Sequence, residues 1–179
     1  MKNKGYDSPD AIARAVNEPE IGVHFVGDEQ HMILDGVDVT GTIRTPEASM
    51  LASKVGGVKE VRQRMVALQR EFAEGNSVVM DGRDICTHVL PNATLKIFLT
   101  ASSEVRADRR FKELQAKGKN EPYEKVLKEI IERDYADSHR AASPMRQAED
   151  ATLVDTSDMT QDQAVQTIVD LAKKAVGED

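Results

Sequence analysis

Three short β-rich runs separated by helical stretches constrain the fold of this chain more than any other feature of the sequence. They read SVVMD at 77–81, TLKIFLT at 94–100 and TLVDT at 152–156. Such alternation is typical of a parallel α/β sheet. Residues 20–44 instead alternate apolar runs with Gly-Asp and Asp-Gly turn signals, which predicts small antiparallel strands. The predicted fold class is therefore α/β, a parallel-sheet core with a small antiparallel β insert.

Two helices are expected between these regions. Thr45 can cap a helix that has Pro46 in its first position, and the pair Gly56-Gly57 interrupts that helix. A second helix ends at Gly75 and carries an apolar stripe at helical spacing. We expect this stripe to lie in the core; its members are Val61, Met65, Leu68 and Phe72.

Composition excludes several classes of protein. At 179 residues the chain fits one soluble domain, and no run approaches the roughly 18 apolar residues of a membrane span. Because the N-terminus also lacks the apolar middle of a signal peptide, we expect a cytoplasmic location. The single cysteine and the four scattered histidines predict neither a disulfide nor a metal site. A net charge of −7 argues against a general nucleic-acid binder.

A charged cluster, Asp81-Gly82-Arg83-Asp84, directly follows the first β-rich run. In open parallel sheets the ligand crevice lies beyond the carboxyl ends of the strands, so the cluster is well placed for a binding site. An ordinary turn, in which Gly82 relaxes the backbone and Arg83 pairs with its neighbours, explains the same residues equally well.

A second cluster lies in the predicted helix PYEKVLKEIIERDYADSHR. Offsets of four, three, four and three place five residues on one face, which begins apolar and then becomes charged. The charged part is either a site or a surface ladder of weak ion pairs, and taken alone the ladder is preferred. The five residues are Val126, Ile130, Arg133, Asp137 and Arg140.

Three arginines, Arg106, Arg109 and Arg110, share one face of another predicted helix. Ser102 or Ser103 can cap that helix and Gly118 can end it. A solvated face is as good an interpretation of these arginines as an anion site.

Taken together, three segments resemble bacterial cytidylate kinase. They are VVMDGRDICTHVLPNATLKIFLTASSEVRADRR at 78–110, EIIERDYADSHRAASP at 129–144 and ILDGVDVTGTIRTPEASMLASKV at 33–55. The last is similar to the monophosphate-binding insert of that family. The resemblance covers nearly the whole chain, in order and with family-like spacing, and implies a sheet related to other nucleoside monophosphate kinases.

The resemblance implies transfer of the terminal phosphate of ATP, with Mg²⁺, to CMP or dCMP. It assigns Ser53, Arg62 and Asp84 to the cytosine base. It also assigns Arg133 and Asp137 to the sugar and Arg83 and Arg140 to the phosphate of the nucleotide. The resemblance matches Arg106, Arg109 and Arg110 to a lid segment at about 103–122, whose arginines close over the transferring phosphate. The catalytic arginines expected are therefore Arg83, Arg140, Arg109 and Arg110.

The chemistry of cytosine agrees with one of these assignments. Its exocyclic amino group is a donor that the Asp84 carboxylate can accept, whereas uracil presents a carbonyl at the same place. Ser53 and Arg62 would then supply donors to the rest of the base edge. Phosphoryl transfer requires positioning and neutralisation of charge more than a covalent nucleophile, which suits a site rich in arginine.

The sequence departs from the family in one important respect, because it contains no G-x-x-x-x-G-K-[ST] phosphate loop. MKNKGYDSPD resembles a place well inside the usual chain, so we expect a fragment or a start-site error. The first strand, the loop, a helix and the second strand would then be missing. Residues 1–58 would form the insert and 59–179 the remaining core. Cys86, where the family usually has glycine, and His88 are also atypical.

Two other interpretations remain at this stage. The resemblance favours a cytidylate kinase polypeptide that lacks its donor-binding front. A binding module that retains part of the nucleotide pocket without catalysis is a different-class alternative, and turnover with ATP separates these two. A helical structural or adaptor protein is a third possibility, which specific binding of any cytidine nucleotide would exclude. A complete family member is expected to be a monomer, while the truncated chain could self-associate.

Overall fold

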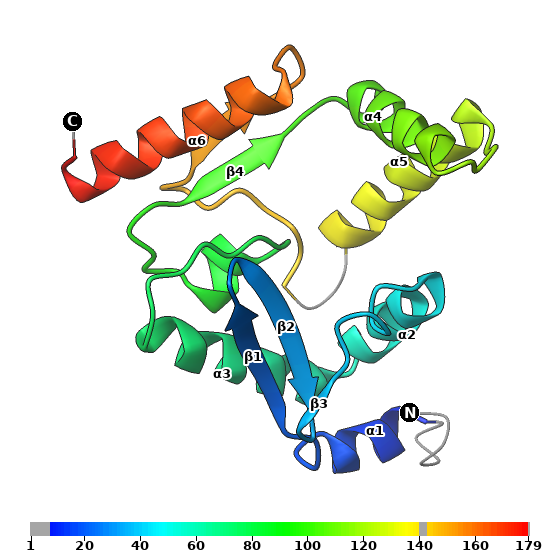
Figure 1. Cartoon of the computed structure of the whole chain (residues 1–179), viewed down its shortest axis with the longest axis vertical. Coiled ribbons are helices and arrows are strands. Elements are labelled where there is room, and N and C mark those ends of the chain that lie inside the picture. The colour runs from blue at the N-terminus through cyan, green and yellow to red at the C-terminus, as the bar shows by residue number, and fades with distance from the viewer. Residues whose placement is uncertain (1–7, 140–142, 179) are drawn as a thin grey trace. The chain divides into compact units, whose positions relative to one another are not determined.

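A computed structural model describes residues 8–139 and 143–178, with the side chains of residues 46, 53 and 54 left out. The described residues form two compact units, which meet in the sequence at Val78. The first contains a three-stranded antiparallel sheet and the second a two-stranded parallel sheet (Figure 1). This confirms the predicted α/β class, with a parallel sheet and a small antiparallel sheet. The arrangement is consistent with a nucleoside monophosphate kinase-like core.

The antiparallel sheet of the first unit has the order β1-β2-β3. Its strands are β1 (Ile21–Val26), β2 (Glu29–Leu34) and β3 (Val37–Asp38). Gly27 and Gly36, with φ of 61° and 78°, lie in the two turns, where a left-handed backbone favours glycine. The turn signals in the sequence therefore predicted these strands correctly.

Asp38 fixes the end of this sheet. Its carboxylate accepts a hydrogen bond from the Thr40 backbone at 2.8 Å and lies 2.6 Å from His31 Nδ1. The Thr40 hydroxyl in turn accepts from the Met32 amide at 2.9 Å. Hydrogen bonds from Thr40, followed by the bond with His31, hold the pKa of Asp38 well below its usual range.

Helices α1 (Pro9–Ala15), α2 (Pro46–Gly56) and α3 (Lys59–Glu74) complete the first unit. Thr45 caps α2 by accepting a hydrogen bond from Ala48 at 3.1 Å, with proline in the first turn. Gly57 is the C-cap of α2 and Gly75 that of α3, so the predicted helix boundaries are confirmed.

The predicted apolar stripe of α3 is only half-buried. Val61, Met65, Leu68 and Phe72 are all partly exposed, while the adjacent Val66 is buried. Both α1 and α2 contact α3. The prediction of an apolar face is thus right, but its buried centre is displaced by one residue.

The parallel sheet of the second unit pairs β4 (Ile97–Thr100) with β5 (Thr152–Asp155). The register runs from Ile97 opposite Thr152 to Thr100 opposite Asp155. Two of the three predicted parallel strands are therefore confirmed. Both carry exposed leucines, Leu99 and Leu153.

The third predicted strand, SVVMD at 77–81, is wrong. These residues have no regular secondary structure, and Val79 is fully exposed at 100%. A strand persists only where its backbone amides and carbonyls pair with a neighbour, and no described strand pairs with this run. Local composition was thus correct for a strand, but the pairing on which a strand depends is not present.

The rest of the second unit is helical: η2, a single π-helical turn (Ile85–Val89), α4 (Ser103–Ala116), α5 (Tyr123–His139) and α6 (Gln161–Val176). Ser102 caps α4, as predicted. Helices α4 and α5 pack side by side as a hairpin (Figure 1). Their shared apolar core consists of Ala107, Leu114 and Val126, against which Phe111, Tyr123, Leu127 and Ile130 pack.

Candidate functional site

The charged cluster at 81–84 leads directly into η2. The Asp84 carbonyl accepts hydrogen bonds from the amides of His88 and Val89, at 2.9 and 3.2 Å, which starts the π-helical turn. Single π-helical turns occur frequently at functional sites. A Cβ on Gly82 would lie 2.8 Å from Ile85 Cγ1, so only glycine fits there without a shift. Local packing therefore sets the path of the backbone that presents Arg83 and Asp84.

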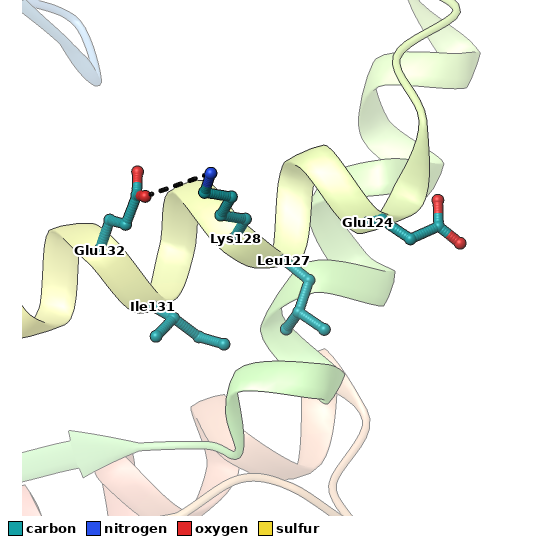
Figure 2. Close-up of a pocket in the computed structure, with 5 residues that line it drawn as sticks. All are labelled: Glu124, Leu127, Lys128, Ile131 and Glu132. Carbon is teal, nitrogen blue, oxygen red and sulfur yellow. Dashed lines mark ion pairs between the residues drawn. The ribbon is translucent and has the colours of Figure 1, made fainter.

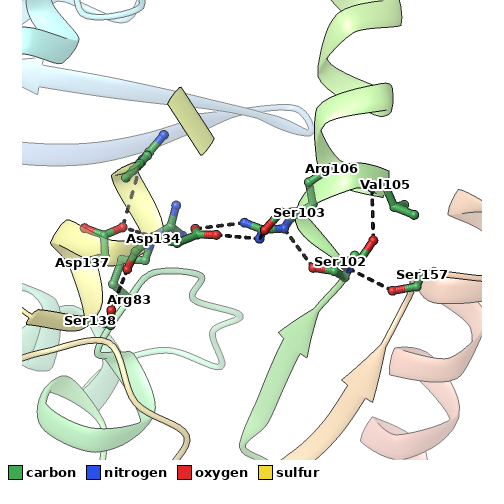
Figure 3. A network of polar contacts seen from close by, with 11 residues as sticks. Arg83, Ser102, Ser103, Val105, Arg106, Asp134, Asp137, Ser138 and Ser157 are labelled. Atoms are coloured by element: carbon green, nitrogen blue, oxygen red, sulfur yellow. Dashed lines mark hydrogen bonds and ion pairs between the residues drawn. The ribbon is translucent and has the colours of Figure 1, made fainter. Parts of the chain in front are cut away.

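An ion pair joins this loop to α5. Arg83 Nε donates to Asp137 Oδ2 at 2.9 Å, with 43% and 21% of the two side chains exposed (Figure 3). The two residues are 54 positions apart in the sequence. The structure thus brings together one member of each charged cluster that the sequence singled out.

Arg133 lies further from the same carboxylate. Its Nε is 4.0 Å from Asp137 Oδ2 and 72% of its side chain is exposed. The predicted helical ladder exists at this step, but the stronger partner of Asp137 is Arg83, on a different element. Arg140, the next member of the stripe, lies outside the described residues.

Three further predicted residues divide between the two units. Arg62 is half-buried on α3 of the first unit, and Ser53 lies on α2, where its side chain is outside the description. Asp84 is half-buried in the second unit, immediately before η2. Their joint role in reading a base stays a prediction.

The arginines of α4 point to three different partners. Arg106 binds Asp134 of α5, Arg109 binds the segment after β5, and Arg110 binds Glu113 one turn along α4. Sequence periodicity placed them on one helical face, but it did not reveal these separate contacts.

Arg109 holds the segment that follows β5. Its Nη2 donates to the carbonyls of Thr156 and Met159, at 2.6 and 3.1 Å. Thr156 is 5% exposed, and its hydroxyl donates to the Thr100 carbonyl at the end of β4 at 3.0 Å. The guanidinium therefore connects α4 to the carboxyl edge of the parallel sheet.

Arg110 is held more weakly. Its Nη1 donates to Glu113 at 2.7 Å, and the same carboxylate accepts from Lys117 at 2.5 Å. These bonds, that of Lys117 first, lower the pKa of Glu113 to about 2. All three side chains are exposed, and exposed pairs contribute little to stability. Arg110 can consequently turn toward an anion at small cost.

Similarity to known proteins shows which family the chain belongs to. The family model described as cytidylate kinase matches residues 7–174. The chain belongs to the cytidylate kinase family.

Similar proteins from several bacteria carry the same family name. A cytidylate kinase from Caldicellulosiruptor bescii is 47% identical over 165 residues, covering 92% of this chain and 73% of the relative. One from Desulforamulus reducens is 51% identical over 150 residues, covering 84% and 68%. One from Flavobacterium johnsoniae is 44% identical over 182 residues, covering 98% and 79%.

Sequence reasoning missed Asp134 and Thr156, which bind two of the α4 arginines. Asp134 lies between Arg133 and Asp137 in the segment that resembles cytidylate kinases, but only the packing of α5 on α4 shows its partner. Thr156 ends a β-rich run and gave no signal beyond that strand. Both contacts join residues at least 28 positions apart, which helical or strand periodicity cannot reveal.

Cys86 is half-buried in η2. Its thiol lies 3.9 Å from the Ile97 carbonyl. It therefore behaves as a small packed side chain beside the Arg83 loop.

A shallow hollow on α5 contains none of the predicted site residues (Figure 2). It is lined along this one helix, and the Lys128–Glu132 pair at 3.7 Å lies at its side. The lining residues are Glu124, Leu127, Lys128, Ile131 and Glu132.

Within residues 8–139 and 143–178, no three His, Cys, Asp or Glu side chains gather to hold a metal ion. The same residues include no helix long and apolar enough to cross a membrane.

The separate partners of Arg109 and Arg110 predict different effects on stability. Arg109→Ala removes bonds to two carbonyls and should lower the free energy of unfolding by about 1–2 kcal/mol. Arg110→Ala, the matched control, removes one exposed pair and should change it by less than about 0.5 kcal/mol. Urea denaturation measures both. Equal losses would contradict the assignment of Arg109 to the segment after β5.

Proposed function

We propose that this chain carries the acceptor site of a cytidylate kinase, an enzyme that transfers the terminal phosphate of ATP to CMP or dCMP. The products would be CDP and dCDP. The observation that best supports this proposal is the Arg83–Asp137 pair, in which two residues assigned to the nucleotide by family resemblance lie 2.9 Å apart. Membership of the cytidylate kinase family gives the pair its chemical meaning.

Arg83 would bind the CMP phosphate together with Arg140. In the structure its Nε is engaged by Asp137 while 43% of the side chain remains exposed. A guanidinium has a planar set of donors, so its other nitrogens can bind a phosphate while Nε keeps Asp137. Asp137 would then orient Arg83 and, with Arg133, contact the sugar.

Asp84, Ser53 and Arg62 would read the base. The half-buried Asp84 can accept from the cytosine amino group and offers no donor to the uracil carbonyl. A base-reading carboxylate left without its donor is costly, which is the physical basis of the proposed selectivity.

Catalysis would depend on placement and neutralisation of charge. Arg109 and Arg110 would approach the transferring phosphate, in keeping with the lid segment they resemble. Arg110 is the freer of the two, because Arg109 holds backbone carbonyls after β5. Arg109 would have to exchange at least one of those bonds for phosphate oxygens.

The donor side is different. The printed sequence contains no G-x-x-x-x-G-K-[ST], the loop whose backbone amides and lysine cradle the donor phosphates. ATP would bring Mg²⁺ with it, but the described residues form no cluster suited to a metal ion, so we assign no step to metal held by this chain. We propose that these 179 residues alone do not turn over ATP and CMP.

A non-catalytic protein that binds cytidine nucleotides is the second candidate. The absence of that motif from the printed sequence favours it, since the acceptor residues do not require the loop in order to bind CMP. The cytoplasmic location and the self-association of a truncated chain stay predictions.

Selectivity tests the acceptor site directly. The 179-residue chain should bind CMP more tightly than UMP, and Asp84→Asn should narrow that preference by roughly tenfold or more, because an amide can also donate to the uracil carbonyl. Calorimetric titration with both nucleotides measures the two ratios.

Asp81→Asn is the matched control, since it makes the same change in the same loop at an exposed residue with no assigned contact to the base. It should leave the CMP:UMP ratio as it is. An unchanged ratio in Asp84→Asn would remove Asp84 from base recognition.

Turnover tests the donor side. The 179-residue chain should form no measurable ADP when CMP is added with ATP. A form extended at its N-terminus by a strand-loop-helix-strand unit with a phosphate loop should turn over, because the added unit supplies both a donor loop and strand partners for residues 77–81. A coupled ADP assay at equal protein concentration compares them. Comparable rates would show that the loop is dispensable.

A further inference from the structure

The guanidinium of Arg106 is bound on three sides. Its Nη1 and Nη2 donate to the two oxygens of Asp134, at 2.9 and 2.6 Å, as a bidentate pair (Figure 3). Nε donates to the Ala101 carbonyl at 2.9 Å, and Nη2 also donates to the Ser103 hydroxyl at 3.1 Å. The Asp134 hydrogen bond is the main reason that the pKa of Arg106 is raised. Such planar, charge-assisted pairs are geometrically specific.

These contacts lie where the chain leaves the parallel sheet. Ala101, which is 6% exposed, directly follows β4, and Ser103 is the first residue of α4. Arg106 therefore connects the end of β4, the first turn of α4 and, through Asp134, the distal part of α5. We refer to the Arg106–Asp134 pair as the clamp.

The clamp closes one end of the α4–α5 hairpin. The apolar core lies toward the connection between the helices, where Phe111 and Tyr123 meet edge to face at 5.9 Å. Toward the sheet, Ile130 is the last residue of α5 in that core, and Asp134 comes one turn later. Beyond the apolar contacts, two polar contacts among the described residues join α5 to the start of α4: the clamp, and the Tyr123 hydroxyl, which donates to the Glu104 carbonyl at 3.4 Å. The clamp is the one of these that lies in the distal part of α5.

Asp134 also lies between two residues of the proposed acceptor site. Arg133 precedes it, and Asp137, which binds Arg83 at 2.9 Å, follows less than one turn later. A rotation or shift of α5 at Asp134 would therefore move both neighbours. Asp134 itself binds Arg106. Among the described residues, Arg83 forms its ion pair with Asp137 and not with Asp134.

We propose that Arg106 and Asp134 are positioning residues that hold α5 in the register required for Arg133 and Asp137 to reach the sugar of a cytidine nucleotide. This inference rests on the proposed function. It gives the arginine-rich helix α4 a second task, in which Arg106 aligns the acceptor helix rather than binding phosphate. Asp84, the proposed base-reading residue, lies outside α5 and is linked to it through its neighbour Arg83, so we expect the clamp to affect the sugar contacts more than base recognition.

The test combines two variants with three nucleotides. Asp134→Asn removes the carboxylate charge at nearly constant side-chain size. Arg106→Lys keeps the positive charge but removes the planar pair of donors that binds both oxygens of Asp134. Each should weaken CMP by roughly threefold or more and dCMP by less, because only CMP carries the 2′-hydroxyl. The ratio of the CMP and UMP affinities should stay unchanged. The double variant should bind CMP no more weakly than either single variant, because both substitutions remove the same contact. Calorimetric titration of the 179-residue chain measures these constants.

Hydrogen exchange tests the same inference without a nucleotide. Asp134→Asn should speed exchange of the amides at 133–139 and leave 107–116 and 123–130 protected. The matched control is Asp108→Asn, which breaks the exposed Lys112–Asp108 pair on α4 at 2.7 Å. It should change neither exchange at 133–139 nor the CMP:dCMP ratio.

The outcomes separate the two proposals. Unchanged amide exchange together with an unchanged CMP:dCMP affinity ratio in Asp134→Asn would contradict a positioning role of the clamp. Equal weakening of the binding of all three nucleotides, with a uniform loss of exchange protection, would contradict it as well. If the unaltered chain binds no cytidine nucleotide, the proposed function fails, and exchange at 133–139 alone decides whether the clamp positions α5.

Discussion

The ion pair between Arg83 and Asp137 is the contact on which the interpretation of this chain depends. Either residue alone fits an ordinary surface feature, Arg83 in a turn and Asp137 in a helical ladder. At 2.9 Å they instead bring the loop after residues 77–81 and the distal part of α5 to one place. In the proposed function, this pair brings a phosphate-binding residue and a sugar-binding residue together from positions 54 apart in the sequence.

Local chemistry made much of the fold predictable. The Thr45 cap, the proline at the first position of α2 and the glycine after α3 each act within a few residues, so their signals are readable in the sequence. The resemblance to cytidylate kinases assigned residues of both charged clusters to one nucleotide, because the matching segments follow in the same order and with similar spacing. The clamp of Arg106 on Asp134 could not be predicted, because helical periodicity says which residues share a face but not what lies opposite.

The prediction that failed is equally informative. Residues 77–81 have the composition of a buried strand, yet Val79 is fully exposed and no described strand pairs with the run. Composition reports a preference, whereas a strand requires hydrogen-bonding neighbours. A strand-loop-helix-strand unit of the kind used in the turnover test would supply both a hydrogen-bonding neighbour for residues 77–81 and a loop that binds the donor phosphates.

The most direct test of an acceptor site in these 179 residues is an NMR titration of the ¹⁵N-labelled chain with CMP. If the proposed acceptor site is correct, CMP should cause saturable shifts in the amide signals of Arg83, Asp84, Arg133 and Asp137 and in the Nε–H signal of Arg83. Helix α6, which carries none of the proposed acceptor residues, should show little change. If saturating CMP left all of those signals unchanged, or moved only signals elsewhere, the proposed acceptor site would be contradicted.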